Sequence, residues 1–463
     1  MLPHVESLQH DVVVIGGGSA GYAAARTLAD GGATVAVVEG AGEVGGLCIL
    51  RGCMPTKALL HAAELREGIR EAAAWGITVP EVAVDAAQLM ARKDALIGEF
   101  AAYRRQQLEA GRWAFLRGHA RFLDPHTLEV TPDLRISAGH FVVATGSVIA
   151  PPPIPGLAGA GYLDSDSALR IREIPGSLIV LGGGAVALEF AQFFSRLGTR
   201  VTVLQRKDQL LRGTDPDVAR ELESALRDEG LTVHTGTQLQ EVTRVGGGVR
   251  ARFEQAGTVR EVEGEAVFHG LGRRPMTDLN LEAAGVAVED SGLIRTNALQ
   301  QTTAPHIYAA GDCCGPHEFV HLAVQQGEVA ARNILGARQP MDYRLLMSVV
   351  FTEPQVATVG LGEAAAREAG EDLLVATYPF NDHGKSMILG ARHGFVKLIA
   401  RRRTGELLGG ACVGPQGGEL IHEVMVALAA RMSAGALAAL PHYHPTLAEI
   451  WTYPAEQIAA AVG

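Results

Sequence analysis

The sequence predicts an α/β protein with two parallel-sheet units of similar design and an α+β region towards its C-terminal end. The first unit shows as an apolar run DVVVI (11–15), a glycine-rich turn, a helical stretch and a second apolar run TVAVVE (34–39). The same order returns later as the apolar run SLIVL (177–181), a glycine-rich turn, the helical stretch LEFAQFFSRLG (188–198) and the apolar run RVTVL (200–204). Short β-branched runs beside glycine-rich turns are typical of buried parallel strands. Near the end, FVKLIAR and LLGGACVG suggest an antiparallel sheet, and IHEVMVALAARM suggests a packed helix.

Composition bounds the class of protein. The 463 residues suggest roughly three domains. The formal net charge of -11 argues against nucleic-acid or membrane-surface partners, which favour basic proteins. The N-terminal MLPHVESLQH lacks the apolar core of a secretory signal, and the apolar stretch 424–440 is interrupted by Arg431 and too short for a confident membrane span. We therefore expect a cytoplasmic protein.

The first unit has the pattern of a dinucleotide-binding fold. Gly16, Gly18 and Gly21 follow the first strand in G-x-G-x-x-G spacing, and YAAARTLADGG then reads as a helix. Such glycines let the backbone approach a pyrophosphate at a helix N-terminus. Glu39 ends the second strand, where an acid accepts hydrogen bonds from a ribose diol. With both strands, the helix and the acid present, we predict a Rossmann-like fold here.

The second unit repeats this pattern with one change. Gly182, Gly184 and Ala187 take the three turn positions, and the third position needs only a small residue. PPPIPG (151–156) is a stiff connector between the two units. Glu39 lies 23 positions after Gly16, and 23 positions after Gly182 the chain has Gln205. The second unit therefore has a neutral amide where the first has a carboxylate.

Basic residues follow that amide. They are Arg206, Lys207 and Arg212. A carboxylate at the end of this strand would repel a 2′-phosphate, whereas arginines bind one bidentately. The first unit thus suits an unphosphorylated adenosine and the second suits NADP, although a solvated basic turn would look the same.

Two of the five cysteines, Cys48 and Cys53, lie in GGLCILRGCMPTK (45–57), shortly after the first unit. Zinc is disfavoured because structural sites need two ligand pairs and no second pair is present. Five residues along a regular helix span about 7.5 Å, longer than the roughly 4.4–6.8 Å between the Cα atoms of a disulfide. A bridge would need a turn relaxed by Gly52. A small, strained disulfide beside a bound cofactor is better explained as a redox centre than as a structural staple.

The chain resembles the class I pyridine nucleotide–disulfide oxidoreductases over nearly its whole length. This family includes dihydrolipoyl dehydrogenase, glutathione reductase and mercuric reductase. The resemblance rests on the redox motif at 45–57 and on four further stretches: ATG (144–146), GRRP (272–275), TTAPHIYAAGD (302–312) and HYHPTLAE (442–449). The redox motif is highly specific for this family.

The resemblance implies a chain of electron carriers. Bound FAD would lie between NADPH and a Cys48–Cys53 disulfide, with Cys53 nearer the flavin and Cys48 attacking the substrate. His444, oriented by Glu449, would exchange protons with the thiols. Lys57 and Glu189 match the ion pair that the family places beside the flavin, where a lysine favours the reduced, anionic form.

The resemblance also implies which residues bind the cofactors. FAD is the expected flavin, and NADPH is preferred over NADH. The expected cofactor-binding residues are Gly16, Gly18, Gly21, Glu39, Thr145, Gly146, Gly311 and Asp312 for FAD, and Gly182, Gly184, Ala187, Arg206, Lys207, Arg212 and Gly272 in the nucleotide-binding segment and at its return. Asp312 would hold the ribityl chain of the flavin.

The expected domain order follows from the same motifs. FAD segments would cover 1–150 and 270–342, an NADP domain 151–269, and a C-terminal dimerisation domain 343–463. In this family the His–Glu pair reaches across from the partner subunit, so we expect a homodimer with a shared active site. The expected activity is NADPH-dependent reduction of a small disulfide.

Two other activities and one non-enzymatic role compete with this expectation. A dihydrolipoyl dehydrogenase would use NAD and serve a multienzyme complex, but that group normally keeps the acid that is Gln205 here. Mercuric reductase fits Arg206, Arg212 and QVATVG (355–360), yet this chain keeps the His–Glu pair that those enzymes have lost and lacks their C-terminal cysteine pair. A flavin-bound scaffold without turnover is disfavoured because every redox part is present.

The remaining candidates have simpler explanations. We expect Cys313 and Cys314 to be small buried residues near the flavin, and Cys412 to belong to a core. His442 would help shape the substrate pocket. His383 and Lys385 would either touch substrate or lie in a solvated loop. No metal site is expected, since no cysteine or carboxylate accompanies His442 and His444 at ligand spacing.

Overall fold

The computed structural model describes residues 6–462, which form two compact units built from separate stretches of chain. Unit 1 comprises the described residues up to Leu59 together with Ala87–Pro151 and Gly272–Met341. Unit 2 comprises Leu60–Ala86, Pro152–Leu271 and the described residues from Asp342 onwards. The first five residues of the stretch examined for a secretory signal lie outside the described part. No helix within residues 6–462 is long and apolar enough to cross a membrane. The domain limits given above stay a prediction.

Unit 1 is built around a seven-stranded sheet in the order β3-β2-β1-β6-β5-β4, with β16 also paired to β6. Strands β1, β2, β3, β6 and β16 are parallel to their neighbours in this group, and β4 and β5 are antiparallel. The strands are β1 (Glu6–Ile15), β2 (Val35–Glu39), β3 (Ala114–Arg117), β4 (Arg121–Asp124), β5 (Thr127–Thr131), β6 (Leu134–Val143) and β16 (Ile307–Ala309). A separate two-stranded sheet pairs β7 (Ser147–Ile149) with β15 (Arg273–Pro275).

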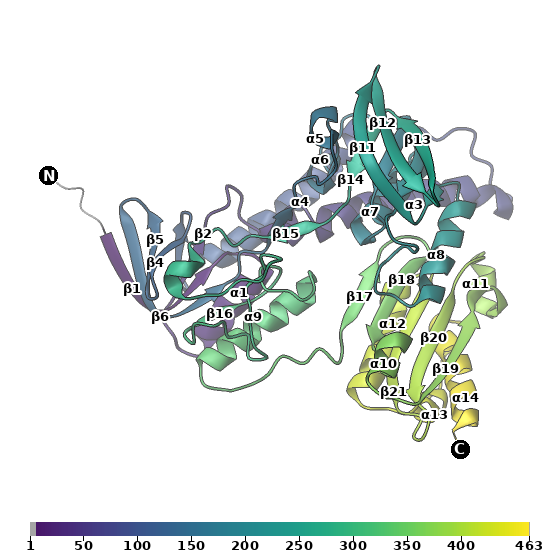
Figure 1. Cartoon of the computed structure of the whole chain (residues 1–463). Coiled ribbons are helices and arrows are strands. Elements are labelled where there is room, and N and C mark those ends of the chain that lie inside the picture. Colours follow the sequence, from purple (N-terminus) through teal and green to yellow (C-terminus); the bar gives the residue numbers. More distant parts are fainter. Residues whose placement is uncertain (1–5, 463) are drawn as a thin grey trace. The chain divides into compact units, whose positions relative to one another are not determined.

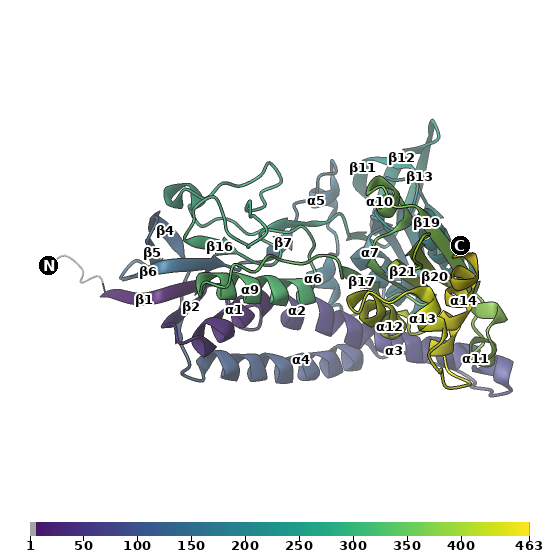
Figure 2. The same ribbon diagram turned by 90° about the horizontal axis from the view of Figure 1, so that it is seen from below.

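The helices of unit 1 include α1 (Ser19–Asp30), α2 (Gly46–Leu50), most of α4 (Ala86–Glu109), η2 (Leu281–Ala284) and α9 (Val320–Ile334). α3 (Cys53–Glu71) begins in unit 1 and continues into unit 2. Helices α1 and α9 pack against each other beside the sheet (Figures 1 and 2). Apolar side chains of β1 and β6 fill the core on both faces of the sheet, which explains why these strands are almost continuously apolar at their C-terminal ends.

Unit 2 contains three sheets. The first is parallel, in the order β10-β9-β8-β14; the second is an antiparallel meander β11-β12-β13; the third is antiparallel, in the order β17-β18-β21-β20-β19. The strands are β8 (Ser177–Leu181), β9 (Arg200–Leu204), β10 (Thr232–His234), β11 (Thr237–Val245), β12 (Gly248–Gln255), β13 (Thr258–Gly264), β14 (Ala266–His269), β17 (Met347–Val350), β18 (Gln355–Gly360), β19 (Leu373–Pro379), β20 (Phe395–Arg401) and β21 (Leu407–Gly414). The predicted antiparallel pairing of FVKLIAR with LLGGACVG is confirmed by β20 and β21.

Unit 2 also contains twelve described helices and 3-10 turns besides the end of α3. They are η1 (Ala72–Trp75), α5 (Leu157–Ala160), α6 (Ser165–Ala168), α7 (Ala185–Arg196), α8 (Pro216–Asp228), α10 (Glu363–Glu368), η3 (Phe380–Asp382), α11 (Gly384–Ile388), α12 (Gly417–Ala429), α13 (Ala434–Ala438), η4 (Ala448–Trp451) and α14 (Thr452–Ala461). In the five-stranded sheet, α12 packs on β18 and β21 while α14 packs on β19 and β20 (Figure 1).

Both predicted Rossmann helices begin three residues earlier than the sequence pattern suggested. α1 starts at Ser19 and α7 at Ala185, directly after Gly18 and Gly184, which serve as N-caps. Neither glycine offers a side chain to cap the helix, so the first backbone N–H groups of each helix are left for a ligand.

Candidate redox and nucleotide sites

The glycine turn of unit 1 forms a close-fitting cradle at the N-terminus of α1. A Cβ atom on Gly21 would lie 1.9 Å from the carbonyl oxygen of Gly16, so only glycine is tolerated there. Gly46, at the start of α2, has φ +76°, and a Cβ atom on it would lie 2.7 Å from Cα of Gly18. The redox motif therefore packs directly on the phosphate-binding turn. This bare backbone at a helix N-terminus fits a dinucleotide pyrophosphate.

Glu39 ends β2 and is 8% exposed. Its Oε2 accepts a hydrogen bond from the backbone N–H of Gly17 at 2.9 Å, and its Oε1 accepts one from Ala41 at 2.8 Å. An ionised carboxylate offers about four acceptor positions, so two remain for the hydroxyls of a ribose. Glu39 is thus held in place and can still bind a diol.

Asp312 lies at the end of the second predicted FAD motif and is fixed by a hydrogen-bond chain. Its Oδ2 accepts from the hydroxyl of Ser147 at 2.7 Å, and Ser147 Oγ in turn accepts from Nε of Arg273 at 2.8 Å. The N–H of Gly311 donates to Oε1 of Gln326 at 2.7 Å. Arg273 belongs to the GRRP motif and Ser147 directly follows the ATG motif, but the sequence did not reveal that these two residues orient Asp312.

Hydrogen bonds also join the segment that contains Thr145 and Gly146 to the segment that contains Gly272 and Met276. Thr145 Oγ1 donates to the carbonyl of Met276 at 2.5 Å, and the carbonyl of Gly146 accepts from the N–H of Met276 at 2.9 Å. The carbonyl of Gly272 accepts from Ala150 at 3.1 Å. The predicted motifs ATG and GRRP thus meet at β7 and β15.

The two redox cysteines lie on different helices. Cys48 belongs to α2, which ends at Leu50, and Cys53 is the first residue of α3. The irregular turn that a bridge would need is therefore present, and Gly52 lies within it. A Cβ atom on Gly52 would lie 3.2 Å from Cα of Cys48, tighter than most real contacts. Neither cysteine is in a disulfide bond in this structure.

The two thiols are electrostatically unequal. A hydrogen bond with Cys53 and burial raise the pKa of Cys48 well above its ordinary value, an effect that the positive charge of Lys57 partly opposes. Cys53 sits at the N-terminus of a 19-residue helix, where the helix dipole favours an anion. The raised pKa of Cys48 and the helix dipole at Cys53 both favour a negative charge on Cys53 over one on Cys48.

Arg104 of α4 is a charged neighbour that no sequence motif indicated. Its guanidinium carbon lies 4.1 Å from the ring centroid of Tyr22, and its buried Nε and Nη1 atoms have no hydrogen-bond partner among residues 6–462. Burial lowers the pKa of Arg104, while Tyr22 and Cys48 act against that shift. In the sequence, only the position of Arg104 within α4 could have indicated this residue.

The second glycine turn, in unit 2, is built like the first. A Cβ atom on Gly182 (φ +111°) would lie 2.5 Å from the carbonyl oxygen of Gly270. The methyl group of Ala187 packs against Gly270, where it would lie 2.8 Å from a Cβ atom built on that glycine. This contact explains why the third turn position tolerates alanine. Gly184 has open space around it.

The end of β9 differs from the end of β2 in charge. Gln205 is 9% exposed, and its Nε2 donates to the carbonyl of Gln209 at 3.0 Å. Arg206, Lys207 and Arg212 are all exposed, and none forms an ion pair with any residue between 6 and 462. The loop also carries two acids, Asp208, which is exposed, and Asp215, which is paired with Lys397 at 2.9 Å. The loop therefore has an excess of positive charge open to a ligand.

Lys57 and Glu189 were predicted to form an ion pair. Lys57 lies on α3, and its charge acts on Cys48. Glu189 lies on α7, is 3% exposed and accepts a hydrogen bond from the N–H of Phe351 at 3.0 Å. The pairing itself stays a prediction.

His444 and Glu449 lie side by side near the C-terminal end. Nδ1 of His444 lies 3.0 Å from Oε2 and 3.2 Å from Oε1 of Glu449. The His444 side chain is 78% exposed and that of Glu449 only 13%. Glu449 belongs to η4, which is anchored by the fully buried Trp451, whose Nε1 donates to the carbonyl of Leu420 at 3.1 Å. A rigid carboxylate thus faces a solvent-exposed imidazole, as an acid–base pair requires.

His442 anchors the same loop. Its Nε2 lies 2.7 Å from Oε1 of Glu423, and its Nδ1 lies 3.0 Å from the carbonyl of Leu440. Burial opposes the charged form, but the bonds to Glu423 and Leu440 outweigh it and raise the pKa of His442. The suggested role of His442 in the substrate pocket stays a prediction.

The expectation that His383 lies in a solvated loop was wrong, and its contact with substrate stays a prediction. The side chain of His383 is fully buried. Its Nε2 lies 3.2 Å from Oε1 of Glu449. Lys385, two residues later, is half-buried. Nothing in the local sequence links His383 to Glu449.

The other cysteines are buried as predicted. Cys313 and Cys412 are fully buried and Cys314 is 9% exposed. Within residues 6–462 no three His, Cys, Asp or Glu side chains are arranged to hold a metal ion.

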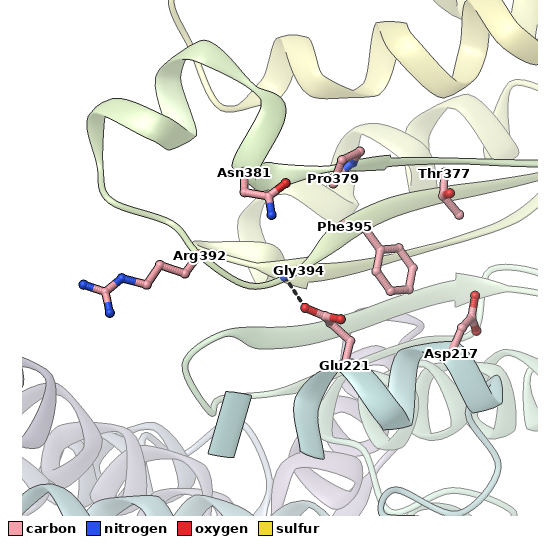
Figure 3. Close-up of a pocket in the computed structure, with 8 residues that line it drawn as sticks. All are labelled: Asp217, Glu221, Thr377, Pro379, Asn381, Arg392, Gly394 and Phe395. Atoms are coloured by element: carbon pink, nitrogen blue, oxygen red, sulfur yellow. Dashed lines mark hydrogen bonds between the residues drawn. The ribbon is translucent and has the colours of Figure 1, made fainter. Parts of the chain in front are cut away.

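A pocket of about 400 Å³ lies between α8 and strands β19 and β20 (Figure 3). Glu221 closes one side, accepting a hydrogen bond from the N–H of Gly394 at 2.7 Å. None of the residues predicted to act in redox chemistry lines this pocket, so we assign it no part in the activity.

Comparison with known proteins agrees with this geometry. The family model described as pyridine nucleotide-disulphide oxidoreductase matches residues 10–327, and the model of that family's dimerisation domain matches residues 346–455. The chain belongs to the pyridine nucleotide–disulphide oxidoreductase family. As a member, it is an FAD-dependent oxidoreductase that uses a pyridine nucleotide, a flavoprotein of the disulfide reductase type, and it carries the family's dimerisation domain.

Proteins similar to this chain carry the names of different enzymes of the family. A dihydrolipoyl dehydrogenase of Thermus scotoductus is 40% identical, covering 95% of both chains. A mercuric reductase of Streptomyces lividans is 36% identical, covering 98% of this chain and 97% of its own. Among solved structures, RclA of Escherichia coli, described as an HOCl-induced flavoprotein disulfide reductase, has a TM-score of 0.86 at 28% identity. LpdA of Mycobacterium tuberculosis has a TM-score of 0.88 at 29% identity, and both cover 97% of this chain and 99% of their own.

Proposed function

We propose that this chain is an NADPH-dependent reductase of a small disulfide, working as a homodimer in which His444 and Glu449 of one subunit serve Cys48 of the other. The observation that carries this proposal is the orientation of His444 by Glu449 at 3.0 Å, which leaves Nε2 of an exposed imidazole free to exchange a proton. Reduction of a disulfide produces a thiolate that must be protonated, and this pair is suited to that step.

The residues support an ordered exchange. Bound FAD supplies a two-electron relay between the nicotinamide and the cysteine pair. In the reduced enzyme His444 removes the proton of Cys48, whose raised pKa makes a base necessary. The Cys48 thiolate then attacks the substrate disulfide, forming a mixed disulfide, and the departing thiolate takes the proton from His444. The Cys53 thiolate attacks the sulfur of Cys48 next, which restores the Cys48–Cys53 disulfide and releases the second half of the substrate as a thiolate that takes a proton from solvent.

Two groups of residues support the cofactor roles. For FAD these are the turn of Gly16, Gly18 and Gly21 with Glu39, and the segments that carry Thr145, Gly146, Gly311 and Asp312. The preference for NADPH rests on the neutral Gln205 followed by Arg206, Lys207 and Arg212, since a 2′-phosphate is bound by exposed cations and repelled by a carboxylate.

Dihydrolipoamide oxidation with NAD is the competing function. The 40% identity with a dihydrolipoyl dehydrogenase favours it, and the charge of the loop after β9 opposes it. Reduction of Hg(II) is suggested by the relationship to mercuric reductases, but it needs no protonated leaving thiol, so it gives no reason for the His444–Glu449 pair.

The experiment is a panel of initial rates with the purified enzyme. NADPH and NADH oxidation would be followed with lipoamide, glutathione disulfide, other low-molecular-weight disulfides and Hg(II), and NAD reduction with dihydrolipoamide. We expect the highest kcat/KM for NADPH with one of the disulfides. Faster Hg(II) reduction than any disulfide reduction, or dihydrolipoamide oxidation with NAD as the best reaction, would refute the proposal.

A further inference from the structure

Glu449 has a second imidazole partner that the family motif does not contain. His383 lies 66 residues earlier in the chain, between η3 and α11, and its side chain is fully buried. Its Nε2 lies 3.2 Å from Oε1 of Glu449, the same oxygen that lies 3.2 Å from Nδ1 of His444. One carboxylate therefore joins a buried and an exposed histidine.

The position of His383 is rigid. Its N–H donates to the carbonyl of Phe380, and its own carbonyl accepts from Met387 at 2.9 Å. On the far side of the ring, Nδ1 lies 2.7 Å from Oγ of the fully buried Ser386. The ring also meets Tyr453 of α14 edge-on at 6.1 Å. Each polar atom of this imidazole thus has one partner at fixed distance.

The direction of the hydrogen bonds follows from the chemistry of the groups. An ionised carboxylate only accepts, so Nε2 of His383 must carry a hydrogen and donate it to Glu449. In a neutral imidazole Nδ1 is then an acceptor, and the hydroxyl of Ser386 donates to it. Burial lowers the pKa of His383, which favours this neutral form. The titratable groups facing the ring are Glu449 from η4, His444 from the preceding loop and Tyr453 from α14.

We propose that His383 is a positioning residue, which holds Glu449 through an uncharged N–H donor so that the carboxylate stays anionic and fixes His444 in the tautomer able to accept a proton at Nε2. This inference rests on the proposed function of the His444–Glu449 pair. A cationic donor in the same place would neutralise Glu449, and no donor would let the carboxylate turn away. His444 would then adopt the Nε2–H tautomer that free imidazoles prefer, which cannot take a proton from Cys48.

The test compares His383→Leu, which removes the donor, with His383→Gln, whose Nε2 supplies an uncharged N–H at a similar reach. His393→Gln is the matched control, since His393 contacts Glu221 and Asp228 instead of Glu449. Imidazole tautomers would be read by ¹⁵N NMR of the oxidised, histidine-labelled enzyme at a pH of about 9, where the rings are neutral. Disulfide turnover with NADPH would be measured in parallel.

We expect the unmodified enzyme to show His383 as Nε2–H and His444 as Nδ1–H. His383→Leu should move His444 away from Nδ1–H and lower disulfide turnover about tenfold, the size of one hydrogen bond to a charged group. His383→Gln should restore most of both readouts, and His393→Gln should change neither. The inference is overturned if His444 keeps its tautomer in His383→Leu, or if His383→Gln is as impaired as His383→Leu.

The experiment still decides the inference if a variant does not fold or if the enzyme reduces no disulfide. If His383→Leu does not fold, the spectrum of the unmodified enzyme still decides, because an Nδ1–H or charged His383 overturns the inference and an Nε2–H His383 supports it. If the unmodified enzyme reduces no disulfide, the proposed function fails, while the tautomer of His444 in the variants still judges the positioning role.

Discussion

Nδ1 of His444 lies 3.0 Å from Oε2 of Glu449 and leaves the opposite ring nitrogen in solvent. General acid–base help of this kind contributes roughly 10² to 10⁴-fold to a rate. We therefore expect His444→Gln to lower disulfide turnover by about a hundredfold or more. Reduction of the bound FAD by NADPH, followed by stopped-flow absorbance, should be almost unchanged. Near-normal turnover of the best disulfide by the variant would remove His444 from the mechanism.

The roles of the two cysteines can be separated by colour. A thiolate at Cys53, the first residue of α3, should donate charge to oxidised FAD and give a long-wavelength absorbance band. Cys48→Ser should show this band at rest, because Cys53 has then lost its disulfide partner, whereas Cys53→Ser should lack it. The reverse pattern would exchange the two roles, and no band in either variant would contradict the redox pair.

Coenzyme choice should follow the charge after β9. Exposed Arg206, Lys207 and Arg212 outnumber Asp208. Charge-assisted hydrogen bonds are worth about 1.5 to 3 kcal/mol each, which implies at least a tenfold preference for NADPH in kcat/KM. The double change Gln205→Glu with Arg206→Met should move the preference towards NADH. Equal use of both coenzymes by the unmodified enzyme would show that the loop does not select.

Retention of the flavin should depend on Gly46 and not on its neighbour Gly42. Gly46→Ala places a methyl group 2.7 Å from Cα of Gly18 and forces alanine into a left-handed conformation, whereas a Cβ atom on Gly42 meets nothing within 4 Å. Left-handed strain costs roughly 1–2 kcal/mol and overpacking about 1–3 kcal/mol. We expect Gly46→Ala to purify with less FAD, measured as the ratio of absorbance at the flavin and protein bands. Gly42→Ala should match the unmodified protein, and equal FAD content in both variants would argue against the close contact.

Glu353, whose side chain is half-buried, should weaken the fold at neutral and higher pH. Burial raises its pKa from 4.5 to about 8, against the opposing charge of Arg196. Between these two pH values the unfolded chain loses a proton that the folded chain keeps, so stability is fully present below pH 4.5 and is lost as the pH rises towards 8. Glu353→Gln should therefore raise Tm at pH 8 by about 3 °C or more and change it much less at pH 5.

Glu368→Gln is the control for that measurement, because Glu368 is exposed at the end of α10. The Tm of the Glu368→Gln variant should match that of the unmodified protein at both pH 5 and pH 8. A Glu353→Gln variant whose Tm changes equally at pH 5 and pH 8 would mean that ionisation of this side chain is not the cause.

The local patterns were sufficient to predict the elements that carry the chemistry. The strands at 177–181 and 200–204 have the predicted bounds, and the cysteines lie beside the first glycine turn. The residues that define these features lie only a few positions apart in the sequence. The backbone preferences of glycine and of β-branched residues act over the same short range, so the sequence pattern was enough to predict them. The starts of α1 and α7 were missed by three residues because the glycine turn hides where helical geometry begins.

The sequence by itself determined the two dinucleotide folds, the redox pair, the charge difference between Glu39 and Gln205, and the family. Tertiary structure alone decided which side chains hold the predicted site residues in place. Ser147 and Arg273 reach Asp312, and His383 reaches Glu449 across 66 positions of chain. Such contacts depend on how separate elements pack, and neither hydrophobic period nor residue spacing records which distant polar atoms will be buried together.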